Sequence, residues 1–333
     1  ICYHQTKDLT PTSHIKTKRT LKLMSQEISK LSIGTVGSNA LLMGDFQERA
    51  DVMAQIKESA IDHLFIADHV SFHDGFGMDG LINAATLAAM NPDITVFLGV
   101  YLLALRHPVP VARQLSTLSL SAPGRIIFGV GIGGEDRHEM EVCGVDPSTR
   151  GRRTNDCLQV VRSLLSGNSC TFESEFFSIQ DAIIKPAPKP QIPIMIGGRS
   201  TAALKRTAAY GDGWLGVWCS AKRFKQATEE IELLAMEHVR EDLAWKHGLQ
   251  IWVGLDEDKH KARAILAKEM EAMYKIPFDA FEKYSPYGSA EEVAEFLLPY
   301  VENGAKVINI KACASNPAYE VEKVSKICEL LKS

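Results

Sequence analysis

From Leu31 onward the chain alternates short apolar runs with longer helical patterns. Parallel strands that are buried on both faces read as near-continuous apolar runs, and strands alternating with helices are typical of βα units. Eight such units closing on themselves form a barrel, so we predict an α/β protein with a single (β/α)8 TIM barrel. The predicted strands are 31–36, 63–67, 95–103, 125–130, 193–196, 213–217, 250–254 and 306–310.

Two segments interrupt this alternation. Residues 167–192, aromatic and then proline-rich, are an insertion after the fourth strand and its helix, and 274–288 form an aromatic loop before the last predicted helix. Long insertions in compact barrels are often binding loops. For residues 167–192, a binding loop and a segment packed on the flank of the barrel are equally compatible with the sequence. For residues 274–288 we favour an active-site lid. The predicted helices are 46–61, 151–166, 200–210, 222–245, 257–273 and 289–303.

Length and composition agree with one large globular domain. The 333 residues are 45% hydrophobic and 23% charged, and the net charge of -4 gives no reason to expect nucleic acid as a partner. No apolar run reaches the roughly 18 residues of a membrane span.

The seven cysteines are scattered, which favours reduced thiols in a cytoplasmic protein. Residues 1–23 are polar and unpatterned; we interpret them as an extension, with the barrel domain at 24–333.

The clearest candidate site follows the fifth predicted strand. Gly197 and Gly198 precede a basic residue, Arg199, and two hydroxyl residues, Ser200 and Thr201, at the start of a predicted helix. Free amides at a helix N-terminus attract anions, and glycine lets a phosphate approach the backbone. Simple capping of the helix by a hydroxyl explains the same pattern. Spacing alone leaves phosphate binding and capping equally open.

The fourth predicted strand ends in GVGIGG, which includes Gly131. The run only loosely matches the dinucleotide fingerprint and lacks the acidic residue expected about 20 residues later. In a barrel, such glycines let a flat ring lie against the strand, or they form a turn.

Asp68 and His69 follow the second predicted strand. An imidazole at a strand end can exchange a proton with a cofactor or substrate, although a histidine there can equally satisfy a loop. His69, His73 and His107 suggest a metal cluster only weakly, because the first strand lacks the H-x-H pair of metal-dependent barrels. We therefore expect no catalytic metal.

Five stretches together resemble the luciferase-like monooxygenase family, particularly its oxidoreductases that use FMN or the deazaflavin coenzyme F-420 (F420). The resemblance runs from about Leu31 to Leu331, and no single stretch carries it alone. The stretches are IDHLFIADHV, LRHPVPVARQLSTLSLSAPGRIIFGVGIGG, VDPSTRGRRTNDCLQVVRSL, IPIMIGGRSTAALKRTAAYGDGWLG and GSAEEVAEFLLPYVENGAKVINI.

This resemblance implies an isoalloxazine-type ring at the carboxyl end of the barrel. It also implies a non-prolyl cis peptide in the third strand and a catalytic role for His69, with Glu135 as the nearest match to an acidic residue used by some members. The phosphate would lie near the Gly197–Thr201 segment. The residues that we assign to cofactor binding are Asp68, Val100, Tyr101, Gly131, Gly197, Gly198, Arg199, Ser200, Thr201 and Trp214.

The sequence also departs from the family pattern. Sugar-phosphate-oxidising relatives have a tryptophan where His73 stands, and their acidic residue lies one position closer to the glycines than Glu135 does. Bacterial luciferase has an arginine at the place of Val130. These differences argue against bioluminescence and against sugar-phosphate chemistry, and they favour F420 slightly over FMN. The resemblance further implies a homodimer.

The sequence therefore predicts hydride transfer to or from a small organic substrate, or its oxygenation, with bound F420 or FMN. Aromatic residues would line the substrate site and favour an apolar or aromatic molecule, namely Tyr101, Trp214 and Trp218, with Phe278 and Tyr287 as further candidates. The alternative is a non-catalytic flavin-binding barrel. A barrel lyase or isomerase is disfavoured, since it would need a strand-end lysine and the predicted strand ends offer none.

Overall fold

The computed structural model describes residues 31–36, 39–75, 77–134 and 136–333. The proposed extension at 1–23 and the proposed catalytic residue Glu135 lie outside these residues. Eight parallel strands form a closed barrel, because β8 pairs with β9 as well as with β7. The strands are β1 (Ser32–Thr35), β2 (His63–Ile66), β3 (Thr95–Leu102), β4 (Ile126–Gly131), β7 (Ile194–Gly197), β8 (Gly213–Val217), β9 (Gly248–Leu255) and β11 (Val307–Cys313).

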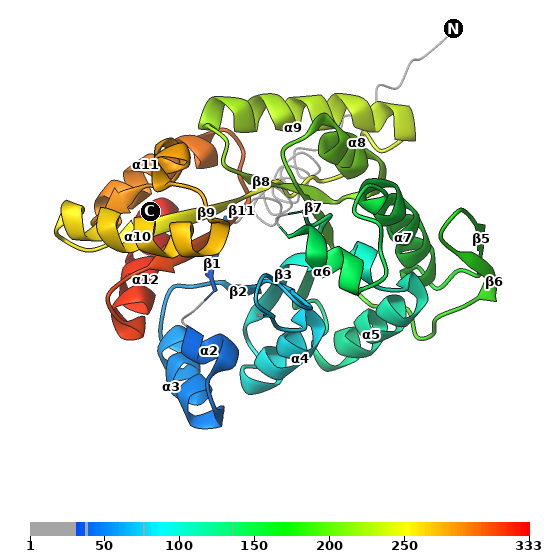
Figure 1. Cartoon of the computed structure of the whole chain (residues 1–333), viewed down its shortest axis with the longest axis horizontal. Helices are drawn as coiled ribbons and strands as arrows, with labels where there is room; N and C mark the ends of the chain where they lie inside the picture. The colour runs from blue at the N-terminus through cyan, green and yellow to red at the C-terminus, as the bar shows by residue number, and fades with distance from the viewer. Residues whose placement is uncertain (1–30, 37–38, 76, 135) are drawn as a thin grey trace, which may run out of the picture.

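Helices surround the strands as an outer layer (Figure 1). The predicted (β/α)8 barrel is confirmed, and each predicted strand coincides with an observed one. The helices are α2 (Asn39–Met43), α3 (Phe46–Lys57), α4 (Gly80–Met90), α5 (Pro108–Ser121), α6 (Arg137–Val142), α7 (Arg150–Leu165), α8 (Thr201–Tyr210), α9 (Ala221–Ala235), α10 (Lys259–Tyr274), α11 (Ala290–Glu302) and α12 (Pro317–Lys332).

The helix predictions were wrong at one long helix and at the end of the chain. The helix expected at 222–245 ends at Ala235, and Val239 then adopts a left-handed conformation. The reason is tertiary: the guanidinium of Arg240 donates to the carbonyls of Ala208 and Gly211 at the end of α8, which draws the chain out of the helix. The segment 274–288 does not precede the last helix, because α12 follows α11 and β11.

The first insertion lies on the flank of the barrel. It contains a hairpin of β5 (Cys170–Glu173) and β6 (Ser178–Ala182), which Figure 1 shows at the periphery beside α7. The following proline-rich stretch binds α5, where Arg113 and Ser116 donate to the carbonyls of Lys185 and Pro186. Flank packing is therefore the better of the two readings for this segment.

A polar layer crosses the interior of the barrel. The His63 ring passes over Gly34 on β1 and lies 2.7 Å from the Asn309 side chain on β11. Asn309 in turn contacts Gln250 at 3.5 Å. A Cβ on Gly34 would lie 2.3 Å from the His63 ring, so glycine is required here. Burial lowers the pKa of His63 to about 4, which keeps the ring neutral at neutral pH.

This close approach gives a stability prediction. We expect Gly34→Ala to lower the free energy of unfolding by about 1–3 kcal/mol, because the new methyl group overpacks the interior. Urea denaturation measures the change. Gly151→Ala is the matched control: a Cβ there meets only Arg206 at 3.4 Å, and alanine favours the helix. Equal effects of the two substitutions would contradict the steric argument.

Candidate functional site

Asp68 fixes the geometry at the ends of β2 and β3. Its buried carboxylate accepts hydrogen bonds from the amides of Gly80 at 2.9 Å and Leu102 at 3.0 Å. Both terminal nitrogens of Arg106 also bind it, at 2.5 and 2.8 Å. Burial raises the pKa of Asp68, against the lowering effect of Arg106 and the two amides. Its oxygens are thus engaged in joining β2, β3 and the start of α4.

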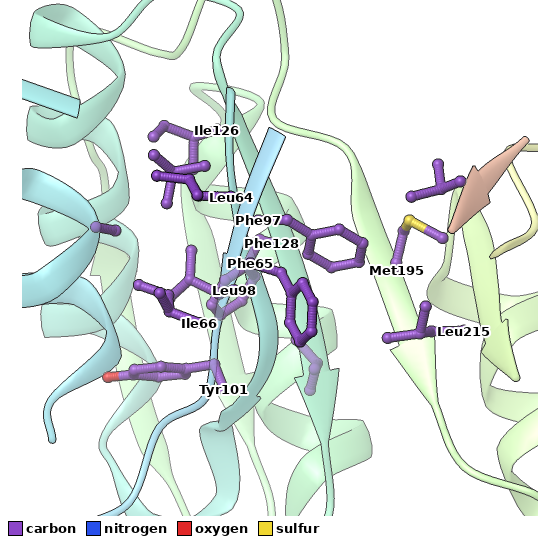
Figure 2. Packing of buried hydrophobic residues seen from close by; sticks show 14 of the residues in the cluster. Leu64, Phe65, Ile66, Phe97, Leu98, Tyr101, Ile126, Phe128, Met195 and Leu215 are labelled. Carbon is purple, nitrogen blue, oxygen red and sulfur yellow. The ribbon is translucent and has the colours of Figure 1, made fainter. Parts of the chain in front are cut away.

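Tyr101 lies on the helix side of the barrel wall. The pairing of β3 with β4 shifts register between Leu98 and Tyr101, which interrupts the usual alternation of side chains. Figure 2 shows the Tyr101 ring on the side of Leu98, away from Phe97 and Met195. The Arg106 guanidinium covers this ring at 4.5 Å from its centroid. Tyr101 is 1% exposed, and this placement puts it behind the strand ends rather than inside the barrel.

His69 is held by an acidic residue that sequence reasoning missed. Its Nδ1 lies 3.1 and 3.2 Å from the two carboxylate oxygens of Glu139 on α6. Glu139 also accepts hydrogen bonds from the amides of Val70 at 2.7 Å and Ser71 at 3.4 Å. The Phe72 ring packs against the imidazole at a centroid distance of 4.2 Å. This carboxylate orients the ring and leaves Nε2 as the nitrogen without a Glu139 contact.

The pKa of Glu139 is lowered from its ordinary value of about 4.5. Burial alone would raise it, but the hydrogen bonds from His69, Val70 and Ser71 favour the charged form more strongly. Glu139 is therefore ionised at neutral pH. The sequence offered only the acidic pattern near GVGIGG as a signal, and we had assigned it to Glu135.

Three residues from neighbouring strands meet inside the carboxyl end of the barrel. A Cβ on Gly131 would lie 2.4 Å from the Val100 side chain, and one on Gly197 would lie 3.1 Å from it. The half-buried Val100 thus occupies the space that two glycines leave. The peptide between Gly99 and Val100 is cis, which confirms the expected non-prolyl cis bond in this strand. The result is a surface of small groups on β3, β4 and β7.

The segment after β7 leads directly into α8. Ser200 caps the helix, since its hydroxyl accepts a hydrogen bond from the Ala203 amide at 3.3 Å. Thr201 is the first helical residue, and amides of a first turn lack acceptors within the helix. Arg199 and Thr201 are exposed, and Gly198 has a φ of +127°, which glycine adopts readily. Capping does take place, and it leaves the Thr201 hydroxyl free of this role.

Trp214 supports this segment from behind. It is 2% exposed and packs against Phe224 of α9 at a centroid distance of 5.5 Å. Its indole N–H donates to the Gly198 carbonyl at 2.7 Å. Trp214 therefore faces the helix layer and fixes the position of the Gly197–Thr201 backbone.

An aromatic cluster covers the ends of β8, β9 and β11. Segment 274–288 contributes Tyr274, Phe278 and Phe281 to it, and they pack with Trp218 and Trp252. Trp218 lies 4.9 Å from Tyr274 and 4.8 Å from Phe281 between ring centroids. This position is where a lid would lie, and that role stays a prediction.

The expectation that no strand end carries a lysine was wrong. The last barrel strand continues to Cys313, three residues beyond its predicted end, and therefore includes Lys311. In register, Lys311 lies beside Trp252 of β9.

Two further observations concern metal ions and membranes in the described part of the chain. There, no group of three or more histidine, cysteine or acidic side chains is placed to hold a metal ion. His107 lies instead against Phe177 of the hairpin, at 5.3 Å between ring centroids. No helix among these residues is both long and apolar enough to cross a membrane.

The fold and these residues define a (β/α)8 barrel whose candidate chemistry lies at the carboxyl ends of its strands. The chain belongs to the luciferase-like monooxygenase family, whose sequence profile matches residues 29–305. The resemblance seen in the sequence is thereby confirmed.

Among curated proteins, the chain is 28% identical over 224 residues to an F420-dependent glucose-6-phosphate dehydrogenase of Kineococcus radiotolerans. The match covers 64% of this chain and 65% of that protein. It is 34% identical over 138 residues to an uncharacterized protein of Mycobacterium tuberculosis, covering 41% of this chain and 47% of the relative. The matched regions thus span about half to two thirds of these relatives.

Solved structures share the fold. An F420-dependent secondary alcohol dehydrogenase in complex with an F420-acetone adduct superposes with a TM-score of 0.79 at 18% identity, covering 91% of this chain and 99% of that one. The monooxygenase RslO1 from Streptomyces bottropensis gives a TM-score of 0.70 at 17% identity, with 91% and 97% covered.

The lowered pKa of Glu139 gives a pH-dependent prediction. Because the folded carboxyl binds its proton less readily, its stabilising contacts are present above about pH 4.5 and are lost as the pH falls through the lower folded value. We expect Glu139→Gln to lower the free energy of unfolding by about 1–3 kcal/mol at pH 7. The difference from the unmodified chain should shrink towards zero in acid.

Urea denaturation across this pH range measures the effect. Glu141→Gln is the control, since Glu141 lies on the same helix with its side chain 53% exposed. A destabilisation by Glu139→Gln that stayed constant into acid would show that the charge on Glu139 is not its source.

Proposed function

We propose that this protein is an oxidoreductase that binds F420 or FMN at the carboxyl end of its barrel and transfers hydride to or from a small organic substrate. The observation that carries the proposal is His69, held through Nδ1 by the ionised Glu139 at the end of β2. Membership of the family and the F420-dependent relatives support the choice of cofactor, with F420 preferred over FMN. Oxygenation is the second chemistry of the same site, because related proteins are named monooxygenases.

The residues present fit such a cofactor. Val100, Gly131 and Gly197 form a surface without large side chains, against which a flat ring can lie. Next to it, the backbone of Gly198, the exposed Arg199 and the start of α8 offer donors and positive charge for a phosphate. We assign Asp68, Tyr101 and Trp214 to positioning the site. Asp68 holds the Leu102 amide and Tyr101 packs under Arg106 at the end of β3, whereas the Trp214 indole N–H holds the Gly198 carbonyl.

His69 is suited to move a proton at Nε2. Its Nδ1 donates to the carboxylate of Glu139, which fixes the neutral tautomer with Nε2 as the acceptor. When bound, the deazaflavin or flavin supplies the hydride acceptor. In such a reaction His69 Nε2 would take the proton of a substrate hydroxyl, and Glu139 would stabilise the imidazolium that forms. In the reverse direction the imidazolium would return this proton to the carbonyl oxygen.

Cofactor binding is the first test. We expect the purified protein to bind F420 or FMN when titrated and followed by absorbance. Arg199→Met should weaken this binding about tenfold, because a charge-assisted contact to phosphate is worth about 1.5–3 kcal/mol. Lys205→Met, which removes an exposed charge from the same helix, should leave the affinity unchanged. Binding of neither cofactor would refute the proposal.

The role of His69 is tested in the loaded protein. We expect His69→Ala to slow reduction of the bound cofactor by an active alcohol about 100-fold or more, with the cofactor affinity unchanged. Single-turnover absorbance measures the rate. Unchanged turnover in His69→Ala would remove this residue from the chemistry. Cofactor binding without turnover of any substrate by the unmodified chain would favour the non-catalytic alternative. Homodimer formation and a cytoplasmic location stay predictions.

A further inference from the structure

Lys311 points into the barrel at its carboxyl end. Side chains alternate along a strand, so Lys311 faces the same way as Asn309, two residues before it. Asn309 faces the interior, because its Nδ2 lies 3.1 Å from the place of a Cβ on Gly99, across the barrel. On the neighbouring strand β9, Gln250 pairs with Asn309 and Trp252 pairs with Lys311, so Trp252 also faces the interior. Lys311 and Trp252 are thus neighbours in the layer of side chains next to the polar layer, on its carboxyl-end side.

The ammonium group of Lys311 forms no ion pair with a carboxylate inside the described part of the barrel. Other lysines have carboxylate partners, such as Lys323 with Glu257 at 2.7 Å, but none of the ion pairs in the described ranges includes Lys311. The acid that interacts electrostatically with Lys311 is Glu320, which accepts a hydrogen bond from Thr35. Gly34 faces the barrel interior, so its neighbour Thr35 points to the helix layer, and Glu320 lies on that side of the strand. Burial raises the pKa of Glu320 to about 7, which weakens its charge near neutral pH. Among the described residues, Lys311 is therefore a half-buried cation without a carboxylate at ion-pair distance.

The surroundings of Lys311 are aromatic. Its Nζ lies 5.7 Å from the centroid of the Trp252 ring, and the Trp252 indole N–H donates to the Tyr274 hydroxyl at 3.0 Å. Tyr274 packs edge-on against Trp218. The buried indole N–H of Trp218 has no acceptor among the residues that the structure describes. One aromatic cluster thus carries both a cation outside any ion pair and an unused buried donor, and an acceptor can bind to either.

We propose that Lys311 binds the carboxylate of an organic-acid substrate whose apolar body lies against Trp252 and Tyr274. The Trp218 N–H is a second donor for polar atoms of the same molecule. Lys311 lies on β11 and the Gly197–Thr201 segment follows β7, with β8 and β9 between them. The two subsites adjoin at Trp218, because the Arg199 guanidinium lies 4.9 Å from the centroid of its ring. The inference rests on the proposed function and specifies its substrate class.

Benzoate and benzyl alcohol are matched probes for this subsite, since they share a ring and differ in the carboxylate. Each is titrated into the chain without cofactor, followed by tryptophan fluorescence, and into the cofactor-loaded protein, followed by cofactor absorbance. We expect the protein to bind benzoate at least tenfold more tightly than benzyl alcohol. Lys311→Met and Lys311→Gln should abolish this preference, whereas Lys311→Arg should keep it. Lys268→Met, an exposed charge removal on α10, should also keep it.

Equal binding of the two probes by the unmodified chain would overturn the proposal, and so would a benzoate preference that survives in both neutral Lys311 variants. Cofactor titration of the same variants separates the two hypotheses. Lys311→Met should bind the cofactor normally, whereas a chain that binds benzoate through Lys311 but binds neither F420 nor FMN would refute only the proposed function.

Discussion

The site depends on one buried ion pair, between Asp68 and Arg106. A charge removed from water is costly unless every lone pair finds a donor, and Asp68 meets this condition with two guanidinium nitrogens and two backbone amides. Those amides belong to the start of α4 and to the end of β3, just beyond its irregular register. The ion pair thus holds in place both the irregular strand that presents Val100 and the chain that presents His69.

The carboxyl end of the barrel is divided between two kinds of surface. On β2, β3, β4 and β7 it presents small residues, a histidine and free backbone donors, which suit a flat cofactor and proton transfer. On β8, β9 and β11 it presents an aromatic cluster and an unpaired lysine, which suit recognition of a second molecule. The first surface requires glycine at positions 131 and 197, because the Val100 side chain occupies the space of a Cβ there. The second surface requires segment 274–288, which supplies part of the aromatic cluster.

The barrel could be predicted because its signal is local: each strand is a short apolar run, and each helix has its own periodicity. Contacts between distant segments could not be predicted in this way. Glu139 reaches His69 across seventy positions from a short helix, and nothing in its own neighbourhood marks it as a partner. Lys311 was missed because a charged residue in an apolar run reads as the end of a strand. Tyr101 and Trp214 were expected to line the substrate site, but a shift of register and a helix-facing position place them behind the strands.

The polar layer of His63, Asn309 and Gln250 affects how ligands enter and leave the barrel. In the part of the chain that the structure describes, these side chains fill the interior below the carboxyl end, so we expect ligands to enter the barrel from that end. Two molecules that meet there must use one opening. The molecule that lies deeper would have to enter first and leave last, so we expect an ordered addition and release for a reaction between them.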